Sequence, residues 1–118
     1  MIREQYMTAL AKANEMRFAA VRLKRRLAAM PRWDSARLLA DELDRGVPDS
    51  PGTRVELLLL SVPSLGPEKV ANLLNRCGVK GRLRVDRLTE RQRDEIVNRL
   101  RDLADAWETA PDRRKVAA

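Results

Sequence analysis

The segment LLLLSVPSLGPEKVANLL, residues 57–74, places two prolines between two apolar stretches that each have the composition of a helix. The residue before a proline is disfavoured in the helical region, so Pro63 predicts the end of the first helix. Proline is favourable at the first helical position, so Pro67 predicts the start of the second. The chain is thereby constrained to two short helices joined by a tight turn, residues 63–66. The second helix has an apolar face and an expected end at Gly78; the face consists of Val70, Leu73, Leu74 and Cys77.

Helical patterns also cover the chain before this turn. Residues 2–30 contain neither glycine nor proline, and Pro31 ends this uninterrupted stretch. A stripe at spacings of three and four residues predicts one long amphipathic helix there: Met16, Ala20, Leu23, Leu27 and Met30. For the next, shorter helix we expect Asp34 or Ser35 as the N-cap and Gly46 at the C-terminal end. Its apolar face is Ala36, Leu39, Ala40 and Leu43.

Two further helix starts are predicted from capping boxes. Thr53 with Glu56 opens a short apolar helix, and Thr89 with Gln92 opens the last helix. The stripe of the last helix is Ile96, Leu100, Leu103 and Trp107. No segment alternates convincingly as a strand, so the sequence predicts an all-α chain of about five helices. We expect a basic N-terminal region (1–46), a loop (47–52), a compact helical domain (53–107) and a flexible tail (108–118).

The charge of the chain favours a polyanionic partner. Its 118 residues carry 24 Lys and Arg against 17 Asp and Glu, a net charge of +7. Residues 1–30 hold seven basic and two acidic side chains, residues 31–60 four and six, and residues 61–118 thirteen and nine. Two basic blocks therefore flank an acidic one, which is typical of a nucleic-acid or anionic-surface binder.

The composition also limits the chemistry that is expected. One cysteine permits no intramolecular disulfide, and without histidine the common zinc-ligand sets cannot form. No metal or other cofactor is expected. The longest apolar run, residues 57–60, is too short to cross a bilayer, and the first residues lack a signal-peptide pattern. We therefore expect a cytoplasmic protein without a membrane partner.

The turn at residues 63–66 is a candidate phosphate site. A helix N-terminus presents free N–H groups and the positive end of the helix dipole, which together favour an oxyanion. Gly66 has no side chain to block a phosphate, and Lys69 adds a charge in the first turn. Ser64 stands where helix-hairpin-helix turns, which this one is similar to, usually have their first glycine. The alternative is a packed helical corner that binds nothing.

A second candidate lies after the second helix. Six basic residues lie between positions 80 and 93, with only Asp86 and Glu90 as acids: Lys80, Arg82, Arg84, Arg87, Arg91 and Arg93. Since Arg82 and Arg84 alternate with apolar residues, an extended segment would present both arginines on one face. Such an anchored display of guanidinium groups suits a phosphate backbone. The alternative is a solvated basic loop.

A third candidate is the run RLKRR in the long first helix, which could provide a second DNA surface. Its basic residues are Arg22, Lys24, Arg25 and Arg26. The alternative is a solvated helix face. Other residues point to structure and not to catalysis: an acidic helix face (Asp41, Glu42 and Asp44), a core cysteine (Cys77) and two packed tryptophans (Trp33 and Trp107). We expect no enzymatic activity.

Taken in order, these pieces resemble the helix-two-turns-helix module of ribosomal protein S13 and, more closely, the actinobacterial integration host factor family of mycobacteria and streptomycetes. The resemblance covers roughly residues 10–105 and includes the RLKRR stretch, Pro63 and Gly66 of the turn, Arg82 and Arg84, and the ERQR start of the last helix. Three residues, Val85, Asp86 and Arg87, come after the arginines where that family usually has a glycine.

The resemblance implies a nucleoid-associated protein, a divergent member that a phage could encode, which binds the backbone of double-stranded DNA with little sequence preference. It also implies DNA bending or compaction, assistance to a phage integrase in site-specific integration, and a monomer or weak dimer. Two alternatives stay open. One is an RNA- or ribosome-binding protein like S13, and the other is a helical interaction module with a homotypic seam along Met16 to Met30.

Overall fold

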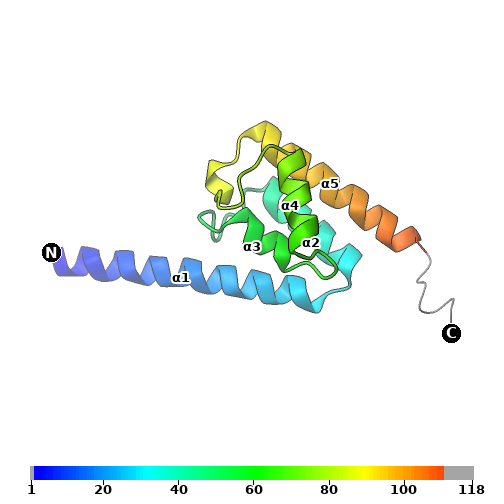
Figure 1. The fold of residues 1–118 in the computed structure, drawn as a ribbon. Coiled ribbons are helices and arrows are strands. Elements are labelled where there is room, and N and C mark those ends of the chain that lie inside the picture. The colour runs from blue at the N-terminus through cyan, green and yellow to red at the C-terminus, as the bar shows by residue number, and fades with distance from the viewer. Residues whose placement is uncertain (1, 111–118) are drawn as a thin grey trace.

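The computed structural model describes residues 2–110, with side chains from residue 5 onward, and consists of five α-helices and one 3-10 turn (Figure 1). In chain order these are α1 (Ile2–Ala29), α2 (Arg32–Asp44), α3 (Val55–Leu60), α4 (Pro67–Arg76), η1 (Val85–Arg87) and α5 (Glu90–Thr109). The predicted all-α fold of about five helices is confirmed. The first two residues of the expected tail, 108 and 109, belong to α5, and its residues 111–118 lie outside the described part of the chain.

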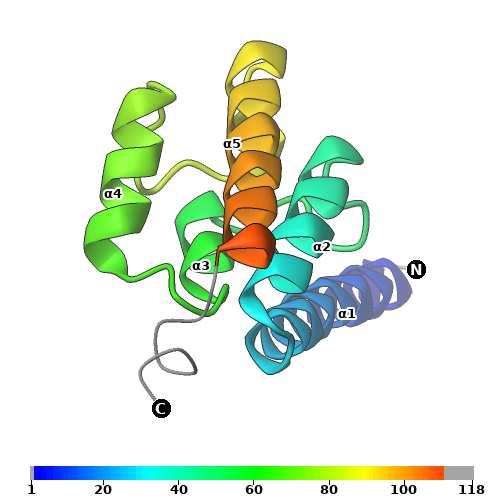
Figure 2. The same cartoon turned by 90° about the vertical axis from the view of Figure 1, so that its right-hand side faces the viewer.

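The helices surround one core beside a projecting α1. Figure 1 shows α1 running along one side of the globule, with its N-terminal half extending beyond it. In Figure 2, α5 stands between α4 and α2, and α2 and α5 form the most extensive helix pair. The largest fully buried side chains come from both halves of the sequence: Leu27, Leu39, Leu43, Leu58, Leu59, Ile96 and Leu100. Burial of each such side chain is worth about 1.5–3 kcal/mol, so α2 and the C-terminal end of α1 are held on the rest of the chain.

The stripe on α1 is used within the chain. Leu27 is fully buried in the core and Leu23 packs against it, whereas Met16 is half-buried. The C-terminal part of the stripe is therefore not free to form a seam with a second copy. The exposed large apolar side chains of α1 lie elsewhere on the helix: Tyr6, Met7, Leu10, Phe18 and Val21.

The predicted N-cap of α2 is wrong. The helix begins at Arg32 with Pro31 as its N-cap, and Asp34 lies in the first turn. Ser35 is fully buried, and its hydroxyl donates to the carbonyl oxygen of Leu27 at 2.8 Å. The last carbonyls of a helix lack partners within it, so this bond satisfies the end of α1. The serine stabilises the α1–α2 corner in place of the start of α2.

The predicted capping box at Thr53 is also wrong, because tertiary pairing determines how α3 starts. The helix begins at Val55 with Arg54 as its N-cap and without a side-chain cap. The carbonyl of Thr53 accepts a hydrogen bond from the N–H of Val85 at 2.9 Å, which keeps residues 53 and 54 extended. By contrast, the capping box of Thr89 and Gln92 on α5 is confirmed.

The other predicted helix ends are confirmed. The helix α3 ends at Leu60, three residues before Pro63, and α4 starts at Pro67. Gly46 and Gly78 follow the C-cap residues of α2 and α4 and adopt φ of +78° and +67°, where a side chain would be strained. Among the described helices, none combines the length and the apolar character needed to cross a membrane.

Candidate nucleic-acid interface

The turn between α3 and α4 has its strained residue at Ser64. Ser64 is exposed and adopts φ of +73°, in the left-handed region that favours glycine. Gly66, by contrast, has φ of −80° and ψ of 173° and is the N-cap of α4. Gly66 is therefore not required for a positive φ. Glycine would adopt this conformation at lower cost than the serine does.

The start of α4 is open to a ligand. Within residues 2–110, no acceptor is found for the N–H groups of Gly66, Glu68 and Lys69. A Cβ atom built on Gly66 would have no heavy atom within 4 Å, so its missing side chain leaves free space above the turn. Lys69 is exposed in the first helical turn, as is Glu68. Three amides and one ammonium group therefore face solvent, together with one opposing carboxylate.

The segment that carries Lys80 to Arg87 is anchored on the residues before α3. Three backbone hydrogen bonds join it to residues 51–55: Val55 N–H to Leu83 O (3.1 Å), Val85 N–H to Thr53 O (2.9 Å) and Asp86 N–H to Pro51 O (2.9 Å). Val85 is buried and Leu83 is half-buried, while Arg82 and Arg84 are exposed. The alternation expected from the sequence is therefore present, but it is extended over a single bridge before η1 begins.

That bridge brings in Arg54, which sequence reasoning missed. Arg54 and Arg84 lie opposite each other in an antiparallel bridge, and both are exposed. The flanking bonds at Val55 and Val85 make this a non-hydrogen-bonded pair, the kind in which opposed side chains lie closest. Asp86 lies 3.4 Å from the Nε atom of Arg84 and offsets part of the charge. No local signal marks Arg54, because only the fold brings it beside residue 84.

Arg91 and Arg93 on α5 differ from the loop arginines. Arg91 pairs with Glu95 at 3.3 Å on the same helix. Arg93 is half-buried, and its Nε atom is buried without a hydrogen-bond partner in the described part of the chain. The first of these side chains is partly neutralised and the second is partly enclosed, so both are weaker phosphate ligands than Arg82 or Arg87.

The residues predicted for the first surface form two clusters. We call Ser64, Gly66 and Lys69 the turn cluster, and Arg54, Lys80, Arg82, Arg84 and Arg87 the loop cluster. The ten residues of α4 separate the turn from the loop, a length of about 15 Å. Figure 1 shows α4 rising from the turn and leading at its other end toward the loop. Beyond that end, Gln92 Nε2 of α5 donates to Gly78 O at 2.9 Å.

The predicted second surface on α1 faces partly toward acids. Arg22, Arg25 and Arg26 are exposed and Lys24 is half-buried. Arg22 and Arg26 line a cleft between α1 and the loop after α2 that also contains Glu42 and Asp49. The positive field of this segment is therefore weakened on the side of the globule, while Lys24 and Arg25 do not line that cleft.

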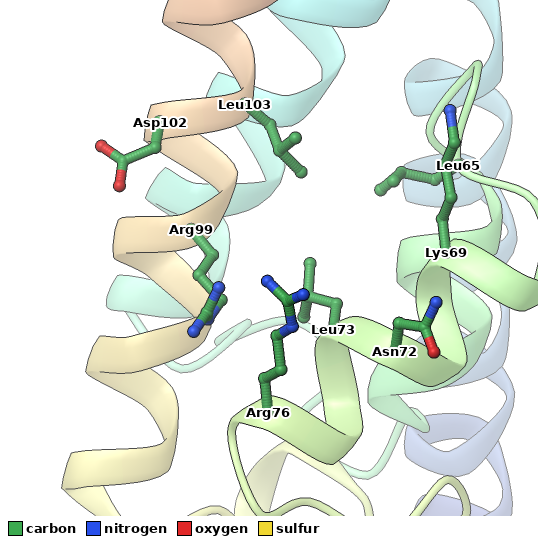
Figure 3. A pocket seen from close by; sticks show the side chains of 8 residues that line it. All are labelled: Leu65, Lys69, Asn72, Leu73, Arg76, Arg99, Asp102 and Leu103. Carbon is green, nitrogen blue, oxygen red and sulfur yellow. The ribbon is translucent and has the colours of Figure 1, made fainter.

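A groove between α4 and α5 adds basic residues that sequence reasoning did not single out. It encloses about 390 Å³ and is lined by Lys69 of the turn cluster together with Arg76 and Arg99 (Figure 3). Arg76 and Arg99 are 23 positions apart, so no local pattern joins them. We call this the α4–α5 groove.

The acidic residues of α2 and α5 form ion pairs between helices, and Cys77 is buried. Arg101 lies 3.3 Å from Asp41 and 3.9 Å from Asp44 and joins α5 to α2. Arg37 pairs with Glu108 and, at 3.0 Å, with Asp105, which raises the pKa of Arg37. Burial raises the pKa of the Cys77 thiol, which keeps it protonated. Among residues 2–110, His, Cys, Asp and Glu form no group of three that could hold a metal ion.

No protein-family model, curated protein or solved structure matches this chain.

Proposed function

We propose that this protein binds double-stranded DNA through the phosphate backbone and shapes the duplex, as a nucleoid-associated protein in the cytoplasm would. The observation that carries the proposal is the opposition of Arg54 and Arg84 on an exposed backbone bridge. Like charges placed directly opposite each other cost stability, so the arrangement indicates a surface made for an anion. Lys80, Arg82 and Arg87 are exposed beside this pair and have no acidic partner in the described residues.

The pairing of the other arginines supports this assignment. Arg37, Arg45 and Arg101 each form an ion pair with an acid on α2 or α5, and so stabilise the fold. In the loop cluster the single ion pair is that of Arg84 with Asp86, among the residues described. The loop cluster thus keeps most of its positive charge for a partner. Duplex DNA is the polyanion with regularly spaced phosphates that such a cluster fits.

The turn cluster provides a second contact on the same protein. The unpaired amides at the start of α4 and the ammonium group of Lys69 suit one phosphate. Since α4 is about 15 Å long, the two clusters would contact phosphates separated by several nucleotides. Neither cluster is rich in base-reading amides, so we expect contacts that position the duplex without reading its sequence.

Bending needs a further contact, for which the basic residues of α1 are the candidate. Smooth bending of a short duplex costs on the order of 1–6 kcal/mol. Contacts at a single patch cannot keep the duplex bent against this cost. The run from Arg22 to Arg26 lies on a different helix from both clusters. In this proposal the loop and turn clusters provide affinity, and α1 provides the second point that curves or bridges the DNA.

The experiment that tests the function is competition for the protein between a duplex DNA, its single strand and an RNA duplex of equal length. The proposal predicts that duplex DNA competes best and that random sequence competes as well as any other. Stronger competition by the RNA duplex would favour the ribosomal alternative and contradict the proposal. Bending is measured by end-to-end FRET on the same duplex. Replacement of the four basic residues of the α1 run by alanine is expected to retain binding and reduce the FRET change.

A further inference from the structure

The α4–α5 groove has the form of a docking site for a protein segment. The two helices are tied together at one end, where Gln92 of α5 bonds the carbonyl of Gly78 after α4. The groove opens between them toward the turn, and its volume of about 390 Å³ falls in the usual range for ligand sites. Figure 3 shows residues of α4 and of α5 facing each other across it.

The floor of the groove is apolar. It is formed by Leu65 from the turn, Leu73 from α4 and Leu103 from α5. Leu65 and Leu73 are only 5% and 6% exposed, so they already belong to the core and present a fixed surface. A floor of three leucines offers no hydrogen-bond donor to a phosphate, which would lose its hydration there without a polar partner. It suits an apolar side chain of a partner protein.

The rim of the groove is basic, and its cations form no ion pair within residues 2–110. In Figure 3 the guanidinium groups of Arg76 and Arg99 point toward each other from opposite helices, and Lys69 stands at the end near the turn. None of the three forms an ion pair with a carboxylate in the described part of the chain, although five other arginines do. Asp102 is the acid of this lining, and Figure 3 shows it directed away from Arg76 and Arg99.

We propose that the α4–α5 groove binds an acidic amphipathic helix of a partner protein, with an apolar side chain on the leucine floor and carboxylates on Arg76 and Arg99. The argument is charge complementarity: two converging guanidinium groups favour a carboxylate, which each can bind with two parallel hydrogen bonds. A helix fits because its apolar and acidic side chains repeat on separate faces. Such a partner would be recruited beside the DNA surface, since Lys69 belongs to both.

The test uses a designed peptide and not a mixture of cell proteins. A peptide of about 18 residues with leucine on one face and glutamate on the other is long enough to form a helix. Its counterpart carries lysine in place of every glutamate. Binding is followed by fluorescence anisotropy, and the contacted residues are located by amide chemical-shift changes. We expect the glutamate peptide to bind, the lysine peptide to fail, and the shifts to map to α4 and α5 around Leu73 and Leu103.

The variant is Arg76→Gln with Arg99→Gln. The matched control is Arg45→Gln, a change at the C-terminal end of α2 that does not line the groove. The double variant is expected to weaken peptide binding by roughly tenfold or more while duplex DNA affinity stays unchanged. The control should change neither. The proposal is overturned if the glutamate peptide does not bind, or if the peptide binds the double variant equally well.

A different result would assign the groove to DNA. If duplex DNA shifts the resonances of Arg76 and Arg99 and the double variant loses DNA affinity, the groove is part of the DNA surface and the peptide proposal is wrong. Peptide binding does not depend on the proposed DNA function. A protein that binds the peptide but no duplex would contradict only the DNA proposal.

Discussion

Arg54 and Arg84 lie opposite each other in the bridge that anchors the basic loop on the start of α3. Two like charges at this position cost stability, and a bound phosphate would remove that cost. The replacement Arg54→Gln is therefore expected to raise the free energy of unfolding by about 0.2–1 kcal/mol, measured by denaturant titration. The same change should weaken duplex binding and reduce the slope of log affinity against log salt by about one unit.

The control for this prediction is Arg45→Gln, which removes an exposed arginine that pairs with Glu42 on α2. It should leave DNA affinity unchanged. If Arg54→Gln binds DNA like the parent, Arg54 is not part of the surface and the loop cluster is smaller than proposed.

Ser64 is expected to be a site where glycine stabilises the protein. Its φ of +73° is costly for serine and free of strain for glycine, although glycine loses more entropy on folding. The net effect of Ser64→Gly should be a rise of about 0.5 kcal/mol in the free energy of unfolding. Gly78→Ala, at φ of +67° after α4, should act in the opposite sense. A destabilised Ser64→Gly protein would mean that the serine hydroxyl is needed at the turn.

Substitutions at Gly66 can distinguish a role of the turn in DNA binding from a role in folding. Because its φ is −80° and a Cβ would meet nothing within 4 Å, Gly66→Ala and Gly66→Val should both fold, with a stability loss of at most about 1 kcal/mol. If a phosphate occupies the space above the turn, both variants should bind duplex DNA more weakly, and valine more so. Circular dichroism verifies folding beside each binding curve. Unchanged affinity in folded variants would make the turn a packed corner without a ligand.

Cys77 makes stability depend on pH at the alkaline end. Burial raises the pKa of its thiol in the folded protein, so the unfolded chain loses this proton at a lower pH than the folded one. The contribution to stability is complete below the pKa of the thiol in the unfolded chain and decreases as the pH rises above it. Iodoacetamide should therefore react slowly with the folded protein and rapidly in urea. Fast alkylation of the folded protein would contradict the buried position. Cys77→Ala should remove this part of the pH dependence.

The helix ends that the sequence predicts are those set by neighbouring residues. Pro63, Pro67 and the pair Thr89 and Gln92 each act within one turn of chain, and each is found in the expected role. Ser35 and Thr53 are also of residue types that are favoured as N-caps. Their hydrogen bonds instead join segments that are distant in sequence, Ser35 to Leu27 and Thr53 to Val85. Tertiary pairing overrides the local preference at both positions.

The candidate site is predictable only where its residues are neighbours in the sequence. The exposure of Arg82 and Arg84 agrees with their alternation with buried residues, as expected. Arg54 joins the same surface through a bridge across 30 positions, and the groove joins α4 to α5. Such relationships depend on how the helices pack. The hydrophobic pattern predicts which face of each helix is buried, but it does not predict which other helix that face contacts. The division of the predicted surface by the length of α4 likewise depends on the fold.

The measurement that tests the central claim most directly is the affinity for a random duplex DNA at several salt concentrations, for the parent and for the variant with Arg82, Arg84 and Arg87 changed to alanine. If about four to six phosphates are neutralised, log affinity should fall against log salt with a slope of roughly −4 to −5. The triple variant should bind far more weakly, and its slope should be smaller by about one unit for each phosphate that it no longer neutralises. A parent protein whose duplex affinity is indifferent to salt, or a triple variant with the parent's slope, would contradict the account.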